Sequence, residues 1–325
     1  MLSVIEPAVI LYPHISKTTA VERIESIGRV CYKSERNITE GSAETFVTSL
    51  IKRGHDSVLE HANFCLEVDT RAFAVFVTTL ENLEFVYGFK SFLRCTNIVS
   101  PLISGNARAW RNFFRACVNT DVEIPGFCSV LIKSEPLLFS EWLDYHEETA
   151  GEPIKVFDTS TLTNHVEQMV HHDITVKFIC DRGVSHEFVR HRVGSFSQES
   201  TRYCNYSGSL GVIDIASAFH NNDNANNSLK HEVWGRAVAQ AAENYSELIA
   251  LGAKPDEARC VLPNSTKTEV VITMNGSGWH NFDKLRSSNA AHPQARELAR
   301  KLHSVFEEKY PWLLKPLKIN GGGKH

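Results

Sequence analysis

The segment RHRVGSFSQESTRY, which ends at Tyr203, gathers side chains that bind anions and planar polar groups. It opens with RHR, and Gly194 then permits a sharp turn of the backbone. Hydroxyl and amide side chains follow before Arg202, whose planar guanidinium matches a phosphate or a polar ring. This combination favours a nucleotide ligand. The alternative is a structural role, in which these cations lie on the surface at the end of a helix. Cations in the last turn of a helix stabilise it by roughly 0.3–1 kcal/mol.

Three other segments have the same polar and ionisable character. They are GHDSVLEH at 54–61, EARCVLPNST at 257–266 and NGSGWHNFDKLRSSNAAHPQ at 275–294. Each also has a purely structural alternative. Asp56 or Ser57 could cap a helix, and Arg259 and Arg286 could be helix surface charges. Asn275 could belong to a turn.

Several common site motifs are missing from the sequence. It contains no G-x-G-x-x-G, no phosphate-binding P-loop and no G-x-S-x-G nucleophile motif. HEFVRH resembles a zinc-protease helix but has one residue too many between its histidines. On a helix, His186 and His191 would diverge by roughly 140° around the axis, so no metal site is expected there.

Composition restricts the class of protein. The chain has 325 residues, 42% of them hydrophobic, and a formal net charge of −4, so no global positive field attracts nucleic acid. Its eight cysteines form no C-x-x-C pair, and the N-terminus is a poor signal peptide. No apolar run is long enough to span a membrane. We therefore expect a cytoplasmic protein with reduced thiols and no membrane partner.

Hydrophobic periodicity predicts an α+β protein, with a mixed or antiparallel sheet packed with long helices. The clearest helix is expected at 229–252, after a turn-rich loop at 221–228. Helices are also expected at 18–34, 41–55, 71–90, 106–119, 181–194, 255–263, 278–286 and 292–310. Strands are expected at 62–70, 174–180, 209–216 and 267–275, and an acidic, loop-rich stretch at 121–163.

In this order, the four polar segments resemble the signatures of the flavin-dependent thymidylate synthases, the thymidylate synthase complementing protein family. RHR is followed after seven residues by Ser200, and Arg202 and Tyr203 extend the match. GHDSVLEH is similar to G-H-x-[ST]-x-x-E-H, EARCVLP contains A-R-x-x-L-P, and NGSGWHNFDKLR matches N-x-x-x-x-x-N-F-x-x-x-R. The resemblance implies one domain over 1–325, with a helical and irregular insertion of unknown role at 70–172.

The resemblance also implies a reaction. A methyltransferase of this family converts dUMP to dTMP, with methylene-tetrahydrofolate as the carbon donor. FAD carries the hydride, and NADPH reduces the flavin. Such an enzyme needs no protein nucleophile to attack the uracil ring, which agrees with cysteines that lie in no activating context. A homotetramer with active sites at its subunit interfaces follows by analogy.

Residue by residue, the resemblance assigns the binding sites. FAD is expected to contact Ser57, Arg190, His191, Arg192, Gln198, Asn275 and Asn281. The nucleotide dUMP is expected to contact Glu187, Arg190, Gln198, Ser200, Arg202, Arg259 and Arg286. His55 is a candidate folate contact. Arg286 is the expected catalytic residue, because a fixed cation at the pyrimidine edge favours the deprotonated ring and its electron-rich carbon.

Two positions depart from the family pattern. Gln198 stands where compact members often carry glutamate, and Glu187 stands where glutamine is common.

Two other functions are consistent with parts of the sequence. One is a non-catalytic flavin- or nucleotide-binding protein on the same scaffold. The other is an RNA-binding protein, which the lack of a basic face and of any RNA-binding motif disfavours.

Overall fold

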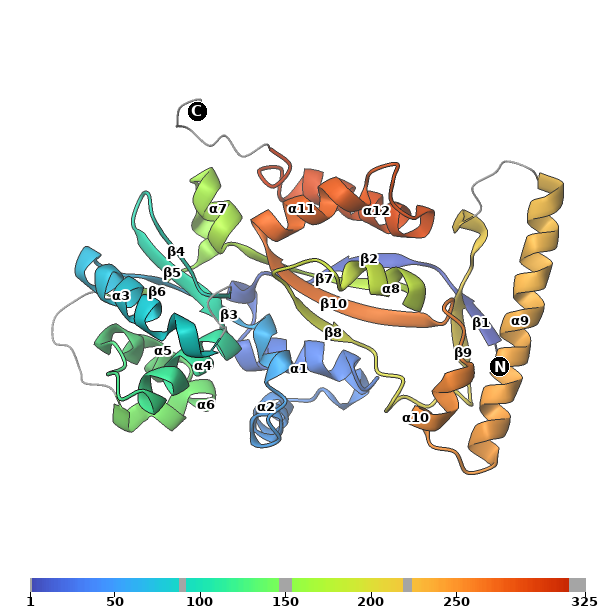
Figure 1. Ribbon diagram of the computed structural model, residues 1–325, viewed down its shortest axis with the longest axis horizontal. Helices are drawn as coiled ribbons and strands as arrows, with labels where there is room; N and C mark the ends of the chain where they lie inside the picture. Colours follow the sequence, from blue (N-terminus) through green and yellow to red (C-terminus); the bar gives the residue numbers. More distant parts are fainter. Residues whose placement is uncertain (1, 88–91, 146–153, 219–223, 316–325) are drawn as a thin grey trace. The chain divides into compact units, whose positions relative to one another are not determined.

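Helices and strands alternate irregularly along the chain in the computed structural model, which describes residues 2–87, 92–145, 154–218 and 224–315 (Figure 1). Parallel and antiparallel strand pairs occur together with long helices, which confirms the predicted α+β class. The chain forms two compact units. Unit 1 comprises Met1–Ala62, Thr175–Thr273 and Asn281–Leu302, and unit 2 comprises Asn63–Ile174, Met274–His280 and His303–His325.

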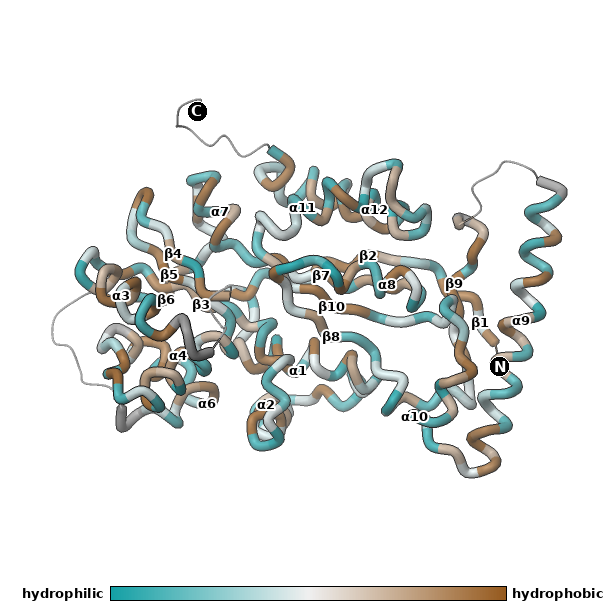
Figure 2. The backbone as a smooth tube through the Cα atoms, in the orientation of Figure 1, coloured by the Kyte–Doolittle hydropathy of each residue, from teal (hydrophilic) through white to brown (hydrophobic). Residues whose placement is uncertain are grey.

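A four-stranded sheet carries the polar segments of unit 1. Its strand order is β2 (Ala8–Leu11), β7 (Asp173–Asp181), β10 (Lys267–Asn275) and β8 (Ser195–Gln198). β2 runs antiparallel to β7, and β8 runs antiparallel to β10. The middle of β10 is hydrophobic in Figure 2, where Val270, Val271 and Ile272 are buried. The strands predicted at 174–180 and 267–275 are therefore confirmed.

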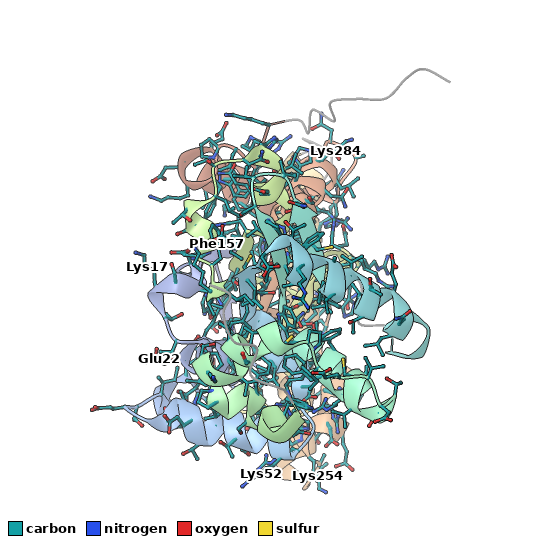
Figure 3. The ribbon with its side chains drawn as sticks, turned by 90° about the vertical axis from the view of Figure 1, so that its left-hand side faces the viewer. Lys17, Glu22, Lys52, Phe157, Lys254 and Lys284 are labelled. Carbon is teal, nitrogen blue, oxygen red and sulfur yellow. The ribbon has the colours of Figure 1, made fainter. Side chains whose placement is uncertain are left out.

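Helix α1 (Ala20–Val30) lies within the helix predicted at 18–34 and begins after a threonine cap. The Thr19 side chain accepts a hydrogen bond from the Glu22 backbone N–H, and the Glu22 carboxylate accepts one from the Thr19 N–H. Ile24 and Ile27 are fully buried on the inner face of the helix, whereas Glu22 lies on its outer side (Figure 3). The capping box and the apolar stripe together explain where this helix begins and which side it buries.

Helix α2 (Ser42–Lys52) lies within the helix predicted at 41–55. Its N-cap residue is Gly41, with φ +75°. The Ser42 hydroxyl donates to the Glu25 carboxylate at 2.8 Å. Gly54, with φ +68°, follows the helix as expected for a residue that accepts the left-handed conformation.

The helix predicted from 229 is longer than expected. Helix α9 (Asn224–Ala250) begins inside the segment predicted as a loop, so the asparagine-rich run from Asn224 onward is helical. Val238 and Tyr245 are buried, whereas Val233 is 58% exposed. The buried residues pack with β9 (Leu210–Ile213), which pairs in parallel with β1 (Leu2–Ile5).

Unit 2 contains a second antiparallel sheet. Its strand order is β4 (Arg94–Asn97), β5 (Pro101–Asn106), β3 (Asn63–Glu67) and β6 (Lys155–Val156). The strand predicted at 62–70 is confirmed as β3, whereas the sequence did not predict β4 and β5. Its helices include α3 (Thr70–Tyr87), α4 (Ala107–Asn119), α5 (Ser129–Ser134), α6 (Pro136–Phe139) and α7 (His165–His171).

Aromatic side chains form the core beneath these helices. Trp110 and Phe113 of α4 lie against Phe76, and Phe114 contacts both Phe139 and Trp142. Most of the segment predicted as an insertion is thus organised around its own hydrophobic core. Its boundaries at 70–172, its role and the single functional domain over 1–325 stay predictions.

In the described part of the chain, the remaining elements are four helices and a set of 3-10 turns. The helices are α8 (Arg182–Phe188), α10 (Pro255–Ala258), α11 (Gly276–Arg286) and α12 (Pro293–Lys309). The 3-10 turns are η1 (Ile15–Lys17), η2 (Glu35–Asn37), η3 (Asp56–His61), η5 (Gly126–Cys128), η6 (Ser140–Tyr145), η7 (Thr159–Thr161), η8 (Ala216–Ala218) and η9 (Arg259–Val261). Within the described ranges, every helix is too short or too polar to cross a bilayer.

Candidate functional site

Arg286, the last residue of α11, is the centre of a hydrogen-bonded cluster in unit 1. One terminal nitrogen donates to the Glu187 carboxylate at 2.6 Å, and the other donates to the Glu187 carbonyl at 2.9 Å. The Nε–H donates to Nε2 of His191 at 2.9 Å. Arg286 thus contacts two other predicted site residues that lie more than 90 positions away in the sequence, and the guanidinium is held on two sides.

His191 is a neutral hydrogen-bond acceptor in this cluster. Its ring is buried against Phe282, with ring centroids 4.8 Å apart. Burial and the neighbouring Arg286 cation lower the pKa of His191 to about 4. Because Nε2 accepts from Arg286, the proton of the neutral ring must be on Nδ1. At neutral pH, only the two arginines of RHR are therefore cationic.

The RHR residues lie beyond the helix that was predicted to contain them. Helix α8 begins after Asp181, whose side chain accepts from the Val184 N–H at 2.6 Å, and ends at Phe188. The prediction of a helix through Gly194 is therefore wrong at its C-terminal end. Arg190 and Arg192 are exposed and form no hydrogen bond or ion pair within the described ranges. Their guanidinium groups stay available to a ligand.

Gln198 has a structural task that the sequence did not reveal. Its amide nitrogen donates to the Ser185 hydroxyl at 2.8 Å and to the Thr268 hydroxyl at 3.2 Å. These bonds tie β8 to α8 and to β10. The amide oxygen is the group that Gln198 can still offer to flavin or nucleotide, and both contacts stay predictions.

The Ser200–Arg202 turn presents a hydroxyl and a cation together. The Arg202 backbone N–H donates to the Ser200 hydroxyl at 3.2 Å, while the Ser200 N–H donates to the Cys31 carbonyl at 3.0 Å. The Arg202 side chain is exposed, and its guanidinium lies 5.6 Å from the ring centre of Tyr203. A phosphate could reach both side chains without displacing a protein partner.

The GHDSVLEH segment folds as η3 and packs against β8, so two of the four motifs meet inside unit 1. His55 and Ser57 are exposed at the start of the turn. The expected cap at Asp56 or Ser57 is wrong, because His55 is the N-cap residue and its side chain forms no capping bond. Both exposed side chains can face a ligand.

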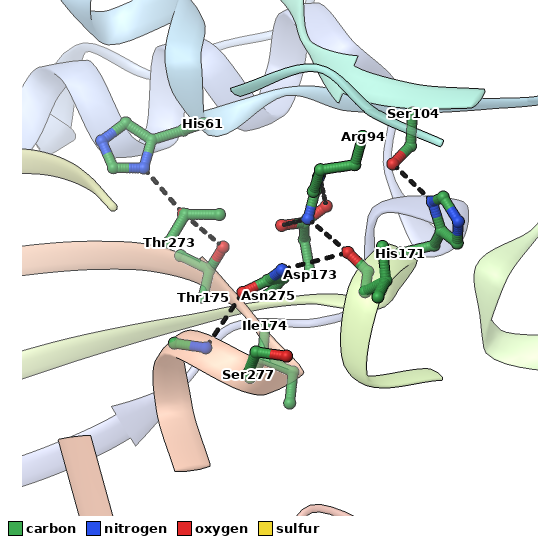
Figure 4. Close-up of polar contacts among 12 residues, drawn as sticks. His61, Arg94, Ser104, His171, Asp173, Ile174, Thr175, Thr273, Asn275 and Ser277 are labelled. Atoms are coloured by element: carbon green, nitrogen blue, oxygen red, sulfur yellow. Dashed lines mark hydrogen bonds and ion pairs between the residues drawn. The ribbon is translucent and has the colours of Figure 1, made fainter. Parts of the chain in front are cut away.

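A buried polar network fixes η3 in place. The His61 ring contacts the Thr273 hydroxyl at 2.8 Å, and Thr273 contacts Thr175 at 2.6 Å (Figure 4). The other ring nitrogen of His61 contacts the Ser197 hydroxyl at 3.0 Å. Arg23 donates to the His61 carbonyl at 3.0 Å. Sequence analysis assigned no role to His61. Its position at the end of a polar motif, directly before a buried strand, was the available signal.

Burial, and to a smaller extent the Arg23 cation, lowers the pKa of His61 from 6.5 to about 3. At a pH between these two pKa values, the unfolded chain binds a proton on His61 that the native protein does not bind. The free energy of unfolding therefore falls as the pH decreases from 6.5. Each pKa unit corresponds to about 1.4 kcal/mol. Denaturant unfolding of His61→Gln should therefore depend less on pH, between pH 7 and pH 5, than unfolding of the wild type. The exposed His186→Gln serves as control, and equal pH dependence in all three proteins would contradict the expectation.

The other predicted residues are not joined to the Arg286 cluster. Arg259, at the start of η9, and Asn281 on α11 are exposed and bond to no other predicted site residue among those described. Asn275 lies in unit 2, where its amide donates to the Val170 carbonyl at 3.1 Å and accepts from the Gly278 N–H at 3.0 Å (Figure 4). It thereby caps α11, whereas the alternative stated for Asn275 was a turn. Its flavin contact stays a prediction.

The donors of unit 1 fit a group such as FAD. Arg190 and Arg192 are exposed cations without a protein partner in the described ranges, and a pyrophosphate accepts such forks. Ser57 and Asn281 add exposed side chains with hydrogen-bond donors. In the same ranges, no group of three or more histidine, cysteine, aspartate or glutamate side chains is arranged to hold a metal ion.

Comparison with known proteins connects these residues to one family. Flavin-dependent thymidylate synthases of Sulfurisphaera tokodaii and Saccharolobus solfataricus are 31% and 29% identical to this chain over 179 and 175 residues. Both alignments cover 53% of this chain, which spans only 65% of the length of either relative. A UMP/dUMP methylase from Streptomyces cacaoi aligns with 96% of this chain and 93% of its own, but at a TM-score of 0.43 and 14% identity, too low to inform the fold.

The sequence model of the thymidylate synthase complementing proteins matches residues 15–78 and 138–312. The matched ranges contain η3, the Arg286 cluster, the Ser200–Arg202 turn and η9. They make up more than half of the 325 residues. This chain belongs to the thymidylate synthase complementing protein family.

Proposed function

We propose that this protein is a flavin-dependent thymidylate synthase, which methylates dUMP to dTMP with methylene-tetrahydrofolate, FAD and NADPH. Family membership and the names of the relatives support the reaction. The observation that carries the proposal is the Arg286 cluster. A guanidinium has five N–H donors, and three of them are used by Glu187 and His191. One N–H on each terminal nitrogen remains for a planar, anionic ligand.

Arg286 is the residue we propose to activate the pyrimidine. Two N–H groups on neighbouring nitrogens match the polar edge of a uracil ring, and the cation favours the ring that has lost its N3 proton. The lost proton leaves more electron density on the carbon that receives the new carbon unit. Because Glu187 and neutral His191 already hold the guanidinium, the charge needs little reorganisation when the substrate binds.

Glu187 has a clear partner in this arrangement. A carboxylate at this position would repel the phosphate of dUMP if it were unpaired. Its ion pair with Arg286, at 2.6 Å, offsets the negative charge. We therefore propose that Glu187 acts on dUMP mainly by orienting Arg286.

The phosphate of dUMP is assigned to Ser200, Arg202 and Arg259, and FAD to Ser57, Arg190, Arg192 and Asn281, with His191, Gln198 and Asn275 as further proposed contacts. When bound, FAD supplies the hydride that completes the methyl group. Exposed arginines are suited to bind the phosphate of dUMP and the pyrophosphate of FAD. The folate contact of His55, the homotetramer and the cytoplasmic location stay proposals.

Purified full-length protein tests the function directly. We expect a flavin absorption spectrum, oxidation of NADPH that dUMP stimulates, and dTMP after methylene-tetrahydrofolate is added, measured by chromatography. A protein that holds flavin and binds dUMP but makes no dTMP would instead be the non-catalytic binder. A protein that binds neither flavin nor dUMP would contradict both functions.

A further inference from the structure

Glu199 is a buried carboxylate between two residues with proposed ligand contacts. It follows β8 directly, lies between Gln198 and Ser200, and is 1% exposed. One carboxylate oxygen lies 3.0 Å from the Lys267 ammonium. The other accepts from the Tyr206 hydroxyl at 2.7 Å and lies 3.2 Å from the Lys33 ammonium. A buried charge persists only with such compensation, so this arrangement is specific.

Lys267 connects Glu199 to the sheet. Its side chain is 11% exposed, and it also pairs with Glu269, which in turn pairs with Lys177 at 2.9 Å. Burial disfavours the charged form of Lys267, but the Glu199 and Glu269 carboxylates outweigh burial and raise its pKa. The Glu199 backbone N–H donates to the Glu269 carbonyl at 2.8 Å. Glu199 is thereby fixed to β10 through both its side chain and its backbone.

Lys33 connects Glu199 to the end of α1. Its φ of +49° is a left-handed conformation, which is unfavourable for a residue with a side chain. In this conformation its ammonium reaches Glu199 and lies 5.3 Å from the ring centre of Tyr206. Two residues earlier, the Cys31 carbonyl accepts from the Ser200 N–H at 3.0 Å. The Ser200–Arg202 turn is therefore fixed from the interior on two sides.

We propose that Glu199 is a positioning residue, which holds the Ser200–Arg202 turn in the conformation that binds the phosphate of a pyrimidine nucleotide. It acts through its ion pairs with Lys267 and Lys33 and does not touch the ligand. The nucleotide part of this inference rests on the proposed function. Glu199 belongs to none of the matched motif positions, and its sequence context, between a glutamine and a serine, looks like an ordinary polar surface.

The test compares Glu199→Gln with Glu269→Gln. Glutamine at 199 retains the size of the side chain and an acceptor for Tyr206 but removes the ion pairs. We expect the Kd and KM for dUMP to rise about tenfold because the binding turn is less pre-organised. The kcat, the flavin content and the KM for NADPH should stay close to wild type. Glu269→Gln removes the other carboxylate from Lys267 without touching the turn, so its affinity for dUMP should be unchanged.

Hydrogen exchange provides a readout that needs no ligand. The amides of Ser200 and Cys204, which donate to the carbonyls of Cys31 and Ser200, should exchange faster in Glu199→Gln than in Glu269→Gln. Glu199→Asp keeps the charge and should restore part of the protection and of the dUMP affinity. It also provides a second variant if the glutamine protein folds poorly.

The outcomes separate the two proposals. If Glu199→Gln and Glu269→Gln lose thermal stability alike, with equal exchange at the turn and equal dUMP affinity, the role of Glu199 is merely structural and the inference is wrong. If the wild type does not bind dUMP, the proposed function and the ligand class fail. Exchange at the turn would then still decide whether Glu199 positions it.

Discussion

Arg286→Ala should lower the rate of dTMP formation by at least about a hundredfold, the loss typical of one fixed donor aimed at developing charge. The protein should remain folded and keep its flavin. Arg286 is 20% exposed and its partner Glu187 is 29% exposed, so water can solvate the carboxylate and the His191 ring when the guanidinium is removed. The loss should appear in kcat, measured by single-turnover formation of dTMP at saturating dUMP.

Two variants make this experiment specific. Lys284→Ala removes an exposed cation from the same helix, on its outer surface (Figure 3), and should leave turnover near that of the wild type. Arg286→Lys keeps the positive charge but loses the planar fork, so it should recover only a small part of the rate. Wild-type turnover in Arg286→Ala would remove Arg286 from the chemistry.

Arg23→Met should lower the free energy of unfolding by about 3–5 kcal/mol, because it removes several charge-assisted hydrogen bonds from the interior. Arg23 is 4% exposed, and its guanidinium donates to the carbonyls of Pro13 and His61 and to the Thr175 hydroxyl. Methionine fills part of the volume but leaves all three acceptors without this donor. Denaturant titration followed by circular dichroism should show the lower midpoint.

Arg36→Met, in η2 shortly after the same helix, is the control. Its side chain is exposed, so the expected loss is within about 0.5 kcal/mol. Equal losses in the two variants would show that the network around His61 adds no special stability. A large loss confined to Arg23→Met would also explain how η3 stays attached to β8.

Local patterns predicted the elements whose residue types agree with their structure. Strand β10 contains a run of β-branched residues and helix α1 has a single apolar stripe, and both occur where expected. Strand β5 was missed because PLISGN contains proline, serine, glycine and asparagine, which favour turns, although it is buried at nearly every position. The start of α9 was missed because asparagines favour turns, yet they continue a long helix.

Motif spacing brought residues that form one cluster into consideration but did not predict their chemical states. Glu187, His191 and Arg286 were all candidates, and they form one cluster. The neutrality of His191 depends on burial and on an arginine 95 positions away, which no local pattern encodes. The burial of Glu199 likewise depends on Lys33 and Lys267, which lie far from it in the sequence.

The aromatic core of unit 2 determines what intrinsic fluorescence reports. Of the five tryptophans, Trp110, Trp142, Trp279 and Trp312 belong to unit 2, and Trp234 belongs to unit 1. Trp234 lies on α9, where its indole N–H donates to the Ser265 hydroxyl at 3.1 Å. Tryptophan emission depends on the environment of each indole. An unfolding curve recorded in this way would describe mainly unit 2, and Trp234→Phe would separate the signal of the unit that contains Arg286.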